Sequence, residues 1–269
     1  MIPKQRKDMK LQLFLFATIL NILPLVYVSA TEEKKPANSE IPQTQDLVNQ
    51  VLTFARSHQD FKNLYFKEHE HEFIRLAEQG QNPHTLFIGC SDSRMVPDLI
   101  LGTKPGELFV IRTAGNFVPP YDQNGWDGVS ATIQYALEAL DVKHIIICGH
   151  SHCGAIKGLF QTINSTQLGI LKRWLQFGNE AKETTMKIVK PETSEKDLYT
   201  VAEQISVVYQ LAHLMTFPAI KKKVDEKTLD LHGWYYKIET GEVSYYDPET
   251  FVFKPLKKLK AQALQTILN

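Results

Sequence analysis

The chain of 269 residues is 43% apolar and carries 30 basic and 30 acidic side chains, so its formal net charge is zero. A chain of this length and apolar content can bury a substantial core, either as one domain or as a large domain with a tail. The balanced charge leaves no basic face for nucleic-acid phosphates, so we expect no nucleic-acid partner. Three cysteines are too few, and odd in number, for a disulfide framework.

Residues 1–30 have the layout of a secretory signal peptide. Basic "MIPKQRKDMK" precedes apolar "LQLFLFATILNILPLVYV", and the small-residue exit "VSA" follows. The alternative is an uncleaved membrane anchor, since about eighteen apolar residues are near the lower limit for a span. Pro24 and the "VSA" exit favour cleavage after Ala30, which leaves 26 basic and 29 acidic residues. We therefore expect an exported protein, periplasmic or secreted, with no stable membrane anchor after cleavage.

The next segment, residues 31–45, is polar and charged and contains two prolines, which predicts a disordered leader. We expect a single folded domain over residues 46–269. Apolar residues three and four apart predict a helix from Asp46 and a second helix that ends on Gly80.

Three short apolar segments predict strands that are buried on both faces: "TLFIG" (85–89), "LFVIR" (108–112) and "HIIIC" (144–148). Helical patterns lie between them, one beginning near Pro97 and one over 127–140. Further helical patterns cover 168–183 and 198–215, a late strand covers 228–240 and continues as a hairpin, and 253–268 has the pattern of a terminal amphipathic helix. The fold class we predict is α/β, with a mainly parallel central sheet flanked by helices, an N-terminal helical arm and a late strand hairpin.

Potential metal ligands follow two of these strands. Cys90 comes directly after the first strand, and His150 and Cys153 follow the third. Because loops at the carboxyl ends of parallel strands converge, the three side chains can meet at one point. Two thiolates and an imidazole suit zinc, and three protein ligands with an open fourth position are typical of a catalytic zinc. The alternatives are a buried thiol pair or a disulfide, a hydrolase that uses Cys90 as its nucleophile, and a non-catalytic zinc-stabilised binding module.

Cys148 and His152 lie beside the proposed ligands in the sequence but are interpreted differently. Cys148 ends an apolar strand and is interpreted as a core residue. His150 is preferred over His152 as the ligand because it follows Gly149 directly at the strand end. We expect His152 to face the mouth of a cleft or the solvent, where it is a hypothetical proton relay.

Four segments carry a family resemblance: "GQNPHTLFIGCSDSRMVPDLI", "PGELFVIRTAGNFVPP", "IIICGHSHCGAIKG" and "LHGWYYKIETG". In order and separation they resemble the β-class carbonic anhydrases over about residues 46–247, which would make 46–269 the catalytic domain. The forms "GHSHCGAIKG" and "RTAGNFVPP" are more similar to the plant-like branch, whose members keep a water on the zinc, than to the branch that closes the metal with an aspartate.

The resemblance implies reversible hydration of carbon dioxide to bicarbonate and a proton, with one Zn²⁺ per subunit held by Cys90, His150 and Cys153. It implies that Asp92 and Arg94 are the catalytic pair. The substrate-binding positions that it implies are Gln81, Phe109, Ala114, Tyr135 and Gly154. Since the family often has Val or Ile where Ala114 stands, the pocket is expected to be slightly roomier. The resemblance also implies a homodimer or a tetramer of dimers, with part of the pocket coming from the second subunit.

The roles of Asp92 and Arg94 have a physical reason. Asp92 can accept a proton of the attacking water in a hydrogen bond, and the planar guanidinium of Arg94 can keep that carboxylate ionised and turned away from the metal. The alternative is an ordinary surface ion pair worth less than about 1 kcal/mol. A remaining alternative for the reaction is another small heterocumulene substrate, such as carbon disulfide, on the same scaffold.

Overall fold

The structure is a computed structural model that describes residues 44–163 and 165–259. The predicted signal peptide and residues 31–43 of the predicted leader lie outside the described residues. The chain divides after Phe61 into two compact units, which are described separately.

The first unit contributes one described helix, α2 (Thr44–Phe61). Its apolar side chains recur three and four residues apart, and Leu47, Val51 and Phe54 are 50%, 64% and 62% exposed. This apolar stripe, defined here by those three residues, therefore lies open along one side of the helix.

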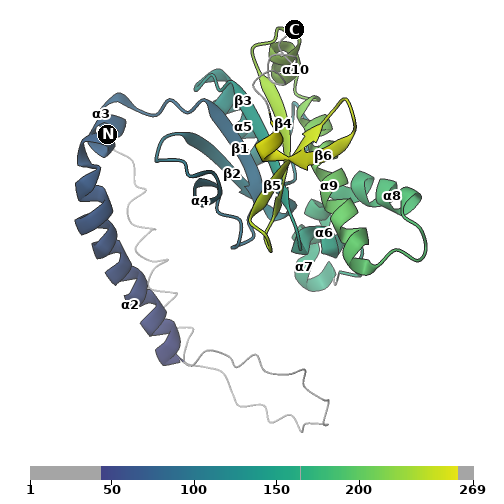
Figure 1. The fold of residues 1–269 in the computed structure, drawn as a ribbon, viewed down its shortest axis with the longest axis horizontal. Coiled ribbons are helices and arrows are strands. Elements are labelled where there is room, and N and C mark those ends of the chain that lie inside the picture. The colour runs from purple at the N-terminus through teal and green to yellow at the C-terminus, as the bar shows by residue number, and fades with distance from the viewer. Residues whose placement is uncertain (1–43, 164, 260–269) are drawn as a thin grey trace, which may run out of the picture. The chain divides into compact units, whose positions relative to one another are not determined.

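The second unit is built on a six-stranded mixed sheet. Its strands are β1 (Thr85–Cys90), β2 (Leu108–Thr113), β3 (His144–His150), β4 (Asp230–Lys237), β5 (Glu242–Asp247) and β6 (Val252–Pro255). The order is β2-β1-β3-β4-β5-β6, parallel from β2 to β4 and antiparallel from β4 to β6. The predicted α/β fold with a mainly parallel sheet and a late hairpin is confirmed, and helices precede the first strand as predicted (Figure 1).

Helices connect and cover these strands. The unit opens with the π-helical turn η2 (Lys62–Phe66) and α3 (Glu70–Gln79). The others are α4 (Pro97–Leu101), η3 (Ala114–Asn116), α5 (Gly128–Glu138), α6 (Gly154–Leu159), α7 (Ser165–Leu175), η4 (Gln176–Gly178), α8 (Asn179–Ile188), α9 (Glu195–Leu214), α10 (Pro218–Asp225) and η5 (Leu256–Lys258). Two of the starts are capped, because Asp127 accepts a hydrogen bond from the backbone of Ser130 and Ser194 accepts one from that of Asp197.

The two sheet faces have separate cores. One face carries the even-numbered side chains of β1 and odd-numbered ones of β3, including Leu86 and Ile147, which pack with α5, α9 and α10. The other face carries Phe87, Ile146 and Cys148, which pack with Met95 and with the half-buried Trp234 of β4. Cys148 is a buried core residue, as its place in an apolar strand predicted.

The amphipathic helix predicted over 253–268 is wrong at its beginning. Phe253 lies in β6, where it pairs with Tyr246 of β5. Its ring packs 5.5 Å from that of Tyr246 and 6.1 Å from that of Tyr235, centroid to centroid. Cross-strand packing therefore overrides the local helical pattern, and residues 260–269 lie outside the described part of the chain.

Within residues 44–163 and 165–259, no helix combines the length and the apolar character that crossing a bilayer requires.

Candidate metal centre

The structure brings Cys90, His150 and Cys153 together. One ligand atom from each lies within 4.8 Å of the others, and all three residues are buried. The cause is the sheet: β1 and β3 are parallel neighbours with Gly89 opposite Cys148, so their carboxyl ends lie side by side. Cys153 joins them from the turn between β3 and α6. The convergence expected of parallel strand ends is thus present.

Backbone amides prepare Cys90 as a thiolate. Its Sγ accepts hydrogen bonds of 3.4 Å from the backbone N–H groups of Asp92 and Gly115. The second of these bonds requires a glycine. Gly115 has a φ of +82°, which other residues rarely adopt, and a Cβ there would lie 2.8 Å from the Phe117 ring. The neighbouring Cys153 thiol has the largest effect on the pKa of Cys90, which falls to about 4, and the same interaction raises the pKa of Cys153.

The imidazole of His150 indicates whether a metal ion fits this site. Its Nδ1 lies 2.9 Å from the carbonyl oxygen of Ser151, to which it donates, so Nε2 is the ring nitrogen that is available to a metal ion. Nε2 is buried and has no hydrogen-bond partner among the described residues. A buried acceptor nitrogen beside two thiols is costly unless a cation occupies the space between them, so the donor set fits zinc.

Asp92 and Arg94 form a two-point ion pair beside this cluster. Arg94 Nε donates to Asp92 Oδ1 at 2.9 Å, and Nη2 donates to Oδ2 at 2.7 Å. Arg94 also donates to the carbonyl oxygen of His152 at 3.1 Å, which ties the two loops together. The Arg94 hydrogen bonds hold the pKa of Asp92 well below its usual range. The Asp92 side chain is only 17% exposed, so this pair differs from a solvated surface ion pair.

Arg112 is a positioning residue that the sequence analysis did not find. From β2 its Nε donates to the carbonyl oxygen of Cys90 at 3.0 Å, and its Nη2 donates to that of Asp92 at 2.7 Å. These bonds fix the backbone of the turn that carries the metal ligand and the carboxylate. The available signal was an arginine in an otherwise apolar strand, at the end of the strand that adjoins Cys90.

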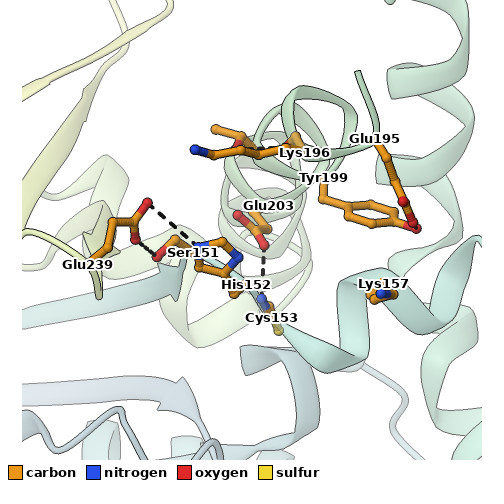
Figure 2. Close-up of a pocket in the computed structure, with 10 residues that line it drawn as sticks. Ser151, His152, Cys153, Lys157, Glu195, Lys196, Tyr199, Glu203 and Glu239 are labelled. Carbon is orange, nitrogen blue, oxygen red and sulfur yellow. Dashed lines mark hydrogen bonds and ion pairs between the residues drawn. The ribbon is translucent and has the colours of Figure 1, made fainter. Parts of the chain in front are cut away.

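Glu203 was missed as well. It lies on the buried face of α9, where Oε1 accepts from the backbone N–H of Cys153 at 2.9 Å (Figure 2). Its Oε2 accepts from the Tyr235 hydroxyl at 2.7 Å. Burial raises the pKa of Glu203. The helix can come this close because Gly149 has no side chain: a Cβ there would lie 2.7 Å from the Val207 side chain. A lone acid on an apolar helical face was the available signal.

A cavity of about 440 Å³ lies beside Cys153 and Glu203. Its lining is Ser151, His152, Cys153, Lys157, Glu195, Lys196, Tyr199, Thr200, Glu203 and Glu239 (Figure 2). His152 points toward Glu239, with Nε2 3.7 Å from Oε1, and its side chain is 53% exposed. It therefore stands outside the cluster and faces a solvent-accessible cavity, as expected.

The predicted pocket residues are spread over both ends of the sheet. Ala114 and Gly154 adjoin the cluster, since each is next in sequence to a residue that contacts or supplies a ligand. Phe109 and Tyr135 contact each other with ring centroids 5.7 Å apart, but Phe109 lies opposite Leu86, about 13 Å along β1 from Cys90. Gln81 is exposed and precedes β1. Within one chain, these three lie toward the amino ends of the strands.

The arrangement defines a class of protein. A buried Cys₂His donor set at the carboxyl edge of a parallel sheet, with an ionised carboxylate beside it, is typical of a mononuclear zinc enzyme.

Comparison with known proteins gives the family. Residues 85–243 match the family described as carbonic anhydrase. Carbonic anhydrase of Synechocystis sp. is 46% identical over 195 residues, which are 70% of this chain and 68% of that protein. Carbonic anhydrase of Pseudomonas aeruginosa is 38% identical over 204 residues, 76% of this chain and 87% of that protein.

Solved structures agree with the sequence relatives. The β-carbonic anhydrase CcaA has a TM-score of 0.73 at 39% identity, over 77% of this chain and 99% of that chain. A tetrameric β-carbonic anhydrase from Sordaria macrospora has a TM-score of 0.66 at 33% identity, over 73% of this chain and 96% of that chain. The chain belongs to the β-class carbonic anhydrases, a family of zinc enzymes, and its activity is the hydration of carbon dioxide.

Proposed function

We propose that each chain hydrates carbon dioxide with one Zn²⁺ held by Cys90, His150 and Cys153, and with Asp92 and Arg94 as the catalytic pair. The observation that carries this proposal is the buried, unpartnered Nε2 of His150 beside two thiols. A zinc ion bound there lowers the pKa of a water molecule toward neutrality.

The proposal includes the arrangement of the plant-like branch, in which the fourth coordination position of the zinc is open to water. Both carboxylate oxygens of Asp92 accept hydrogen bonds from Arg94, and Asp92 lies outside the ligand cluster. The fork of Arg94 therefore holds the carboxylate as a hydrogen-bond acceptor for the water that attacks carbon dioxide. Because its pKa is lowered, Asp92 stays ionised at neutral pH.

His152 is proposed as the group that passes the product proton to solvent. Its ring faces the cavity beside Cys153 and lies 3.7 Å from a Glu239 carboxylate oxygen. In a stopped-flow assay, His152→Ala should make turnover more dependent on buffer concentration. An unchanged buffer dependence would remove His152 from this role.

A second copy of the chain is proposed to complete the pocket. Gln81, Phe109 and Tyr135 lie toward the amino ends of the strands, so a partner subunit is the simplest source of these groups at the metal centre. The edge strand β2 borders an open, mainly apolar groove of about 660 Å³, and Val110 on this strand is 37% exposed. A homodimer, or a tetramer of dimers, covers this surface.

Sedimentation velocity tests the assembly. We expect a dimer or tetramer for the unaltered chain, and dissociation with loss of activity for Val110→Lys. Ile188→Lys is the control, because Ile188 is an exposed apolar residue on α8, at 60% against 37% for Val110, and does not line the groove. An active monomer would refute the shared pocket.

We propose that residues 1–30 direct export and are removed after Ala30, on the strength of their basic, apolar and small-residue order. Intact-mass measurement on protein from the periplasmic fraction should give a chain that begins at Thr31. A full-length chain retained in the membrane would favour the anchor instead.

The central experiment measures zinc content and stopped-flow hydration together. Asp92→Asn should keep its zinc and lose about 100-fold in kcat/KM, because a neutral amide is a weaker acceptor than a carboxylate for the proton of the attacking water. Asp60→Asn, an exposed change on α2, is the control. Unchanged hydration by Asp92→Asn would favour a zinc-stabilised binding module, whereas turnover of carbon disulfide but not of carbon dioxide would favour the alternative substrate.

A further inference from the structure

Three more metal-ligating side chains meet at the opposite end of β3. Their ligand atoms all lie within 4.8 Å of one another: one each from His144, Asp230 and His232. His144 opens β3 and stands directly opposite Asp230 on the parallel strand β4. His232 is two residues further along β4, so strand alternation places it on the same sheet face as Asp230. The register of β3 and β4 therefore holds the three side chains together.

The distances within this group suit a tetrahedral ion. His232 Nε2 lies 3.2 Å from His144 Nδ1, and that Nδ1 lies 3.6 Å from Asp230 Oδ2. Metal–nitrogen bonds of zinc length place neighbouring tetrahedral ligands about 3.3 Å apart. The two imidazole rings are tilted by 47° with centroids 5.3 Å apart, so they converge at their nitrogen atoms and do not stack face to face.

The surroundings leave these ligands available. The group lies on the sheet face that also carries Ile146 and Trp234, away from α5 and α9. The Asp230 side chain is 14% exposed, whereas that of His144 is 42% exposed and gives solvent and ions a route of entry. His232 Nε2 and His144 Nδ1 share a hydrogen bond in this structure, so a metal ion would replace the proton between the two rings.

We propose that His144, Asp230 and His232 form a second metal site, which binds one divalent first-row transition ion such as Zn²⁺ and clamps the beginning of β3 to that of β4. Two imidazoles and one carboxylate favour this class of ion over calcium or magnesium, which prefer all-oxygen ligands. Water occupies the fourth position. The first centre lies about 20 Å away at the other end of β3, so the two sites bind independently.

Cobalt titration of the full-length, chelator-treated and reduced protein tests the proposal. We expect two Co²⁺ per chain. One gives the near-ultraviolet thiolate-to-cobalt band of the Cys90 and Cys153 centre. The second gives only weak visible bands, because its ligands contain no sulfur.

Variants assign the second ion. His144→Gln and Asp230→Asn should each weaken its binding by at least about 100-fold and leave the thiolate band unchanged, which also shows that the variants fold. His71→Gln is the matched control, because His71 is an exposed histidine on α3 outside the group. It should still bind two ions.

Three results would overturn the second site. They are a single Co²⁺ in the unaltered chain whose spectrum has the thiolate band, a second ion that remains in His144→Gln, and a second ion that is lost in His71→Gln. The last result would assign the ion to exposed surface histidines.

Discussion

The two ends of β3 present histidines in contrasting settings. At the carboxyl end, His150 is completely buried, Cys90 accepts two backbone N–H groups, and Glu203 holds the turn at Cys153. At the amino end, His144 is partly exposed, and the contacts that hold its ring are with the other two members of its own group. Ligand identity alone therefore does not make the two sites equivalent.

The difference lies in what supports the ligands. Arg112, Arg94 and Glu203 fix the backbone and carboxylate around the first centre, which suits a site that must keep one coordination position open for chemistry. At the other end, the register of β3 and β4 positions the ligands directly, and the proposed ion would join these two strands.

Removal of a thiolate should have the largest effect. Cys153→Ser should lower the zinc affinity of the first centre by more than about 100-fold and abolish hydration, because a serine hydroxyl is not ionised at neutral pH. Metal analysis after dialysis and a stopped-flow assay measure both. Retention of full zinc and activity would exclude Cys153 as a ligand, while the His144 group should still bind its ion.

Replacement of the guanidinium fork comes next. Arg94→Lys should keep zinc but lower kcat/KM by about 10-fold to 100-fold, since lysine cannot bind both Asp92 oxygens and the His152 carbonyl together. The lowered pKa of Asp92 also predicts that the stability from this pair is complete at neutral pH and is lost as the pH falls below about 4. Acid unfolding that is unchanged in Arg94→Lys would contradict the second expectation.

A smaller effect is expected at the buried acid. Glu203→Gln keeps the size of the side chain but weakens the acceptor for the Cys153 amide, so zinc affinity should fall by about 10-fold. Competition with a chromophoric chelator measures this change. Glu183→Gln on α8 is the control, and equal affinities in the two variants would show that Glu203 has no positioning role.

Thiol alkylation gives the smallest contrast. In reduced, metal-free protein, the lowered pKa of Cys90, about 4, means that its labelling rate should not change between pH 6 and pH 8, whereas an ordinary thiol reacts faster as the pH rises. Because Cys90 is itself buried, the pH dependence of its labelling rate, and not the size of that rate, is the test. Burial raises the pKa of Cys148, which should stay unlabelled. Mass spectrometry locates the label, and bound zinc should protect Cys90. A labelling rate that rises with pH would contradict the lowered pKa.

Local patterns determined much of the architecture. The apolar segments at 85–89, 108–112 and 144–148 all lie in strands, because continuous apolar residues between turns are typical of strands buried on both faces. They also placed Cys90 and His150 at strand ends, from which their meeting followed. The strand at Phe253 was not predictable, because its pairing with β5 depends on a partner and not on its own periodicity.

The sequence by itself predicted the three candidate metal ligands and the parallel sheet that gathers them, because residue type and strand order are enough for both. Only the tertiary structure decided which residues distant along the chain lie next to one another. Glu203 lies fifty residues from Cys153 along the chain, and Asp230 lies directly across the sheet from His144. Such contacts depend on helix packing and strand register, which arise only when the whole core is assembled.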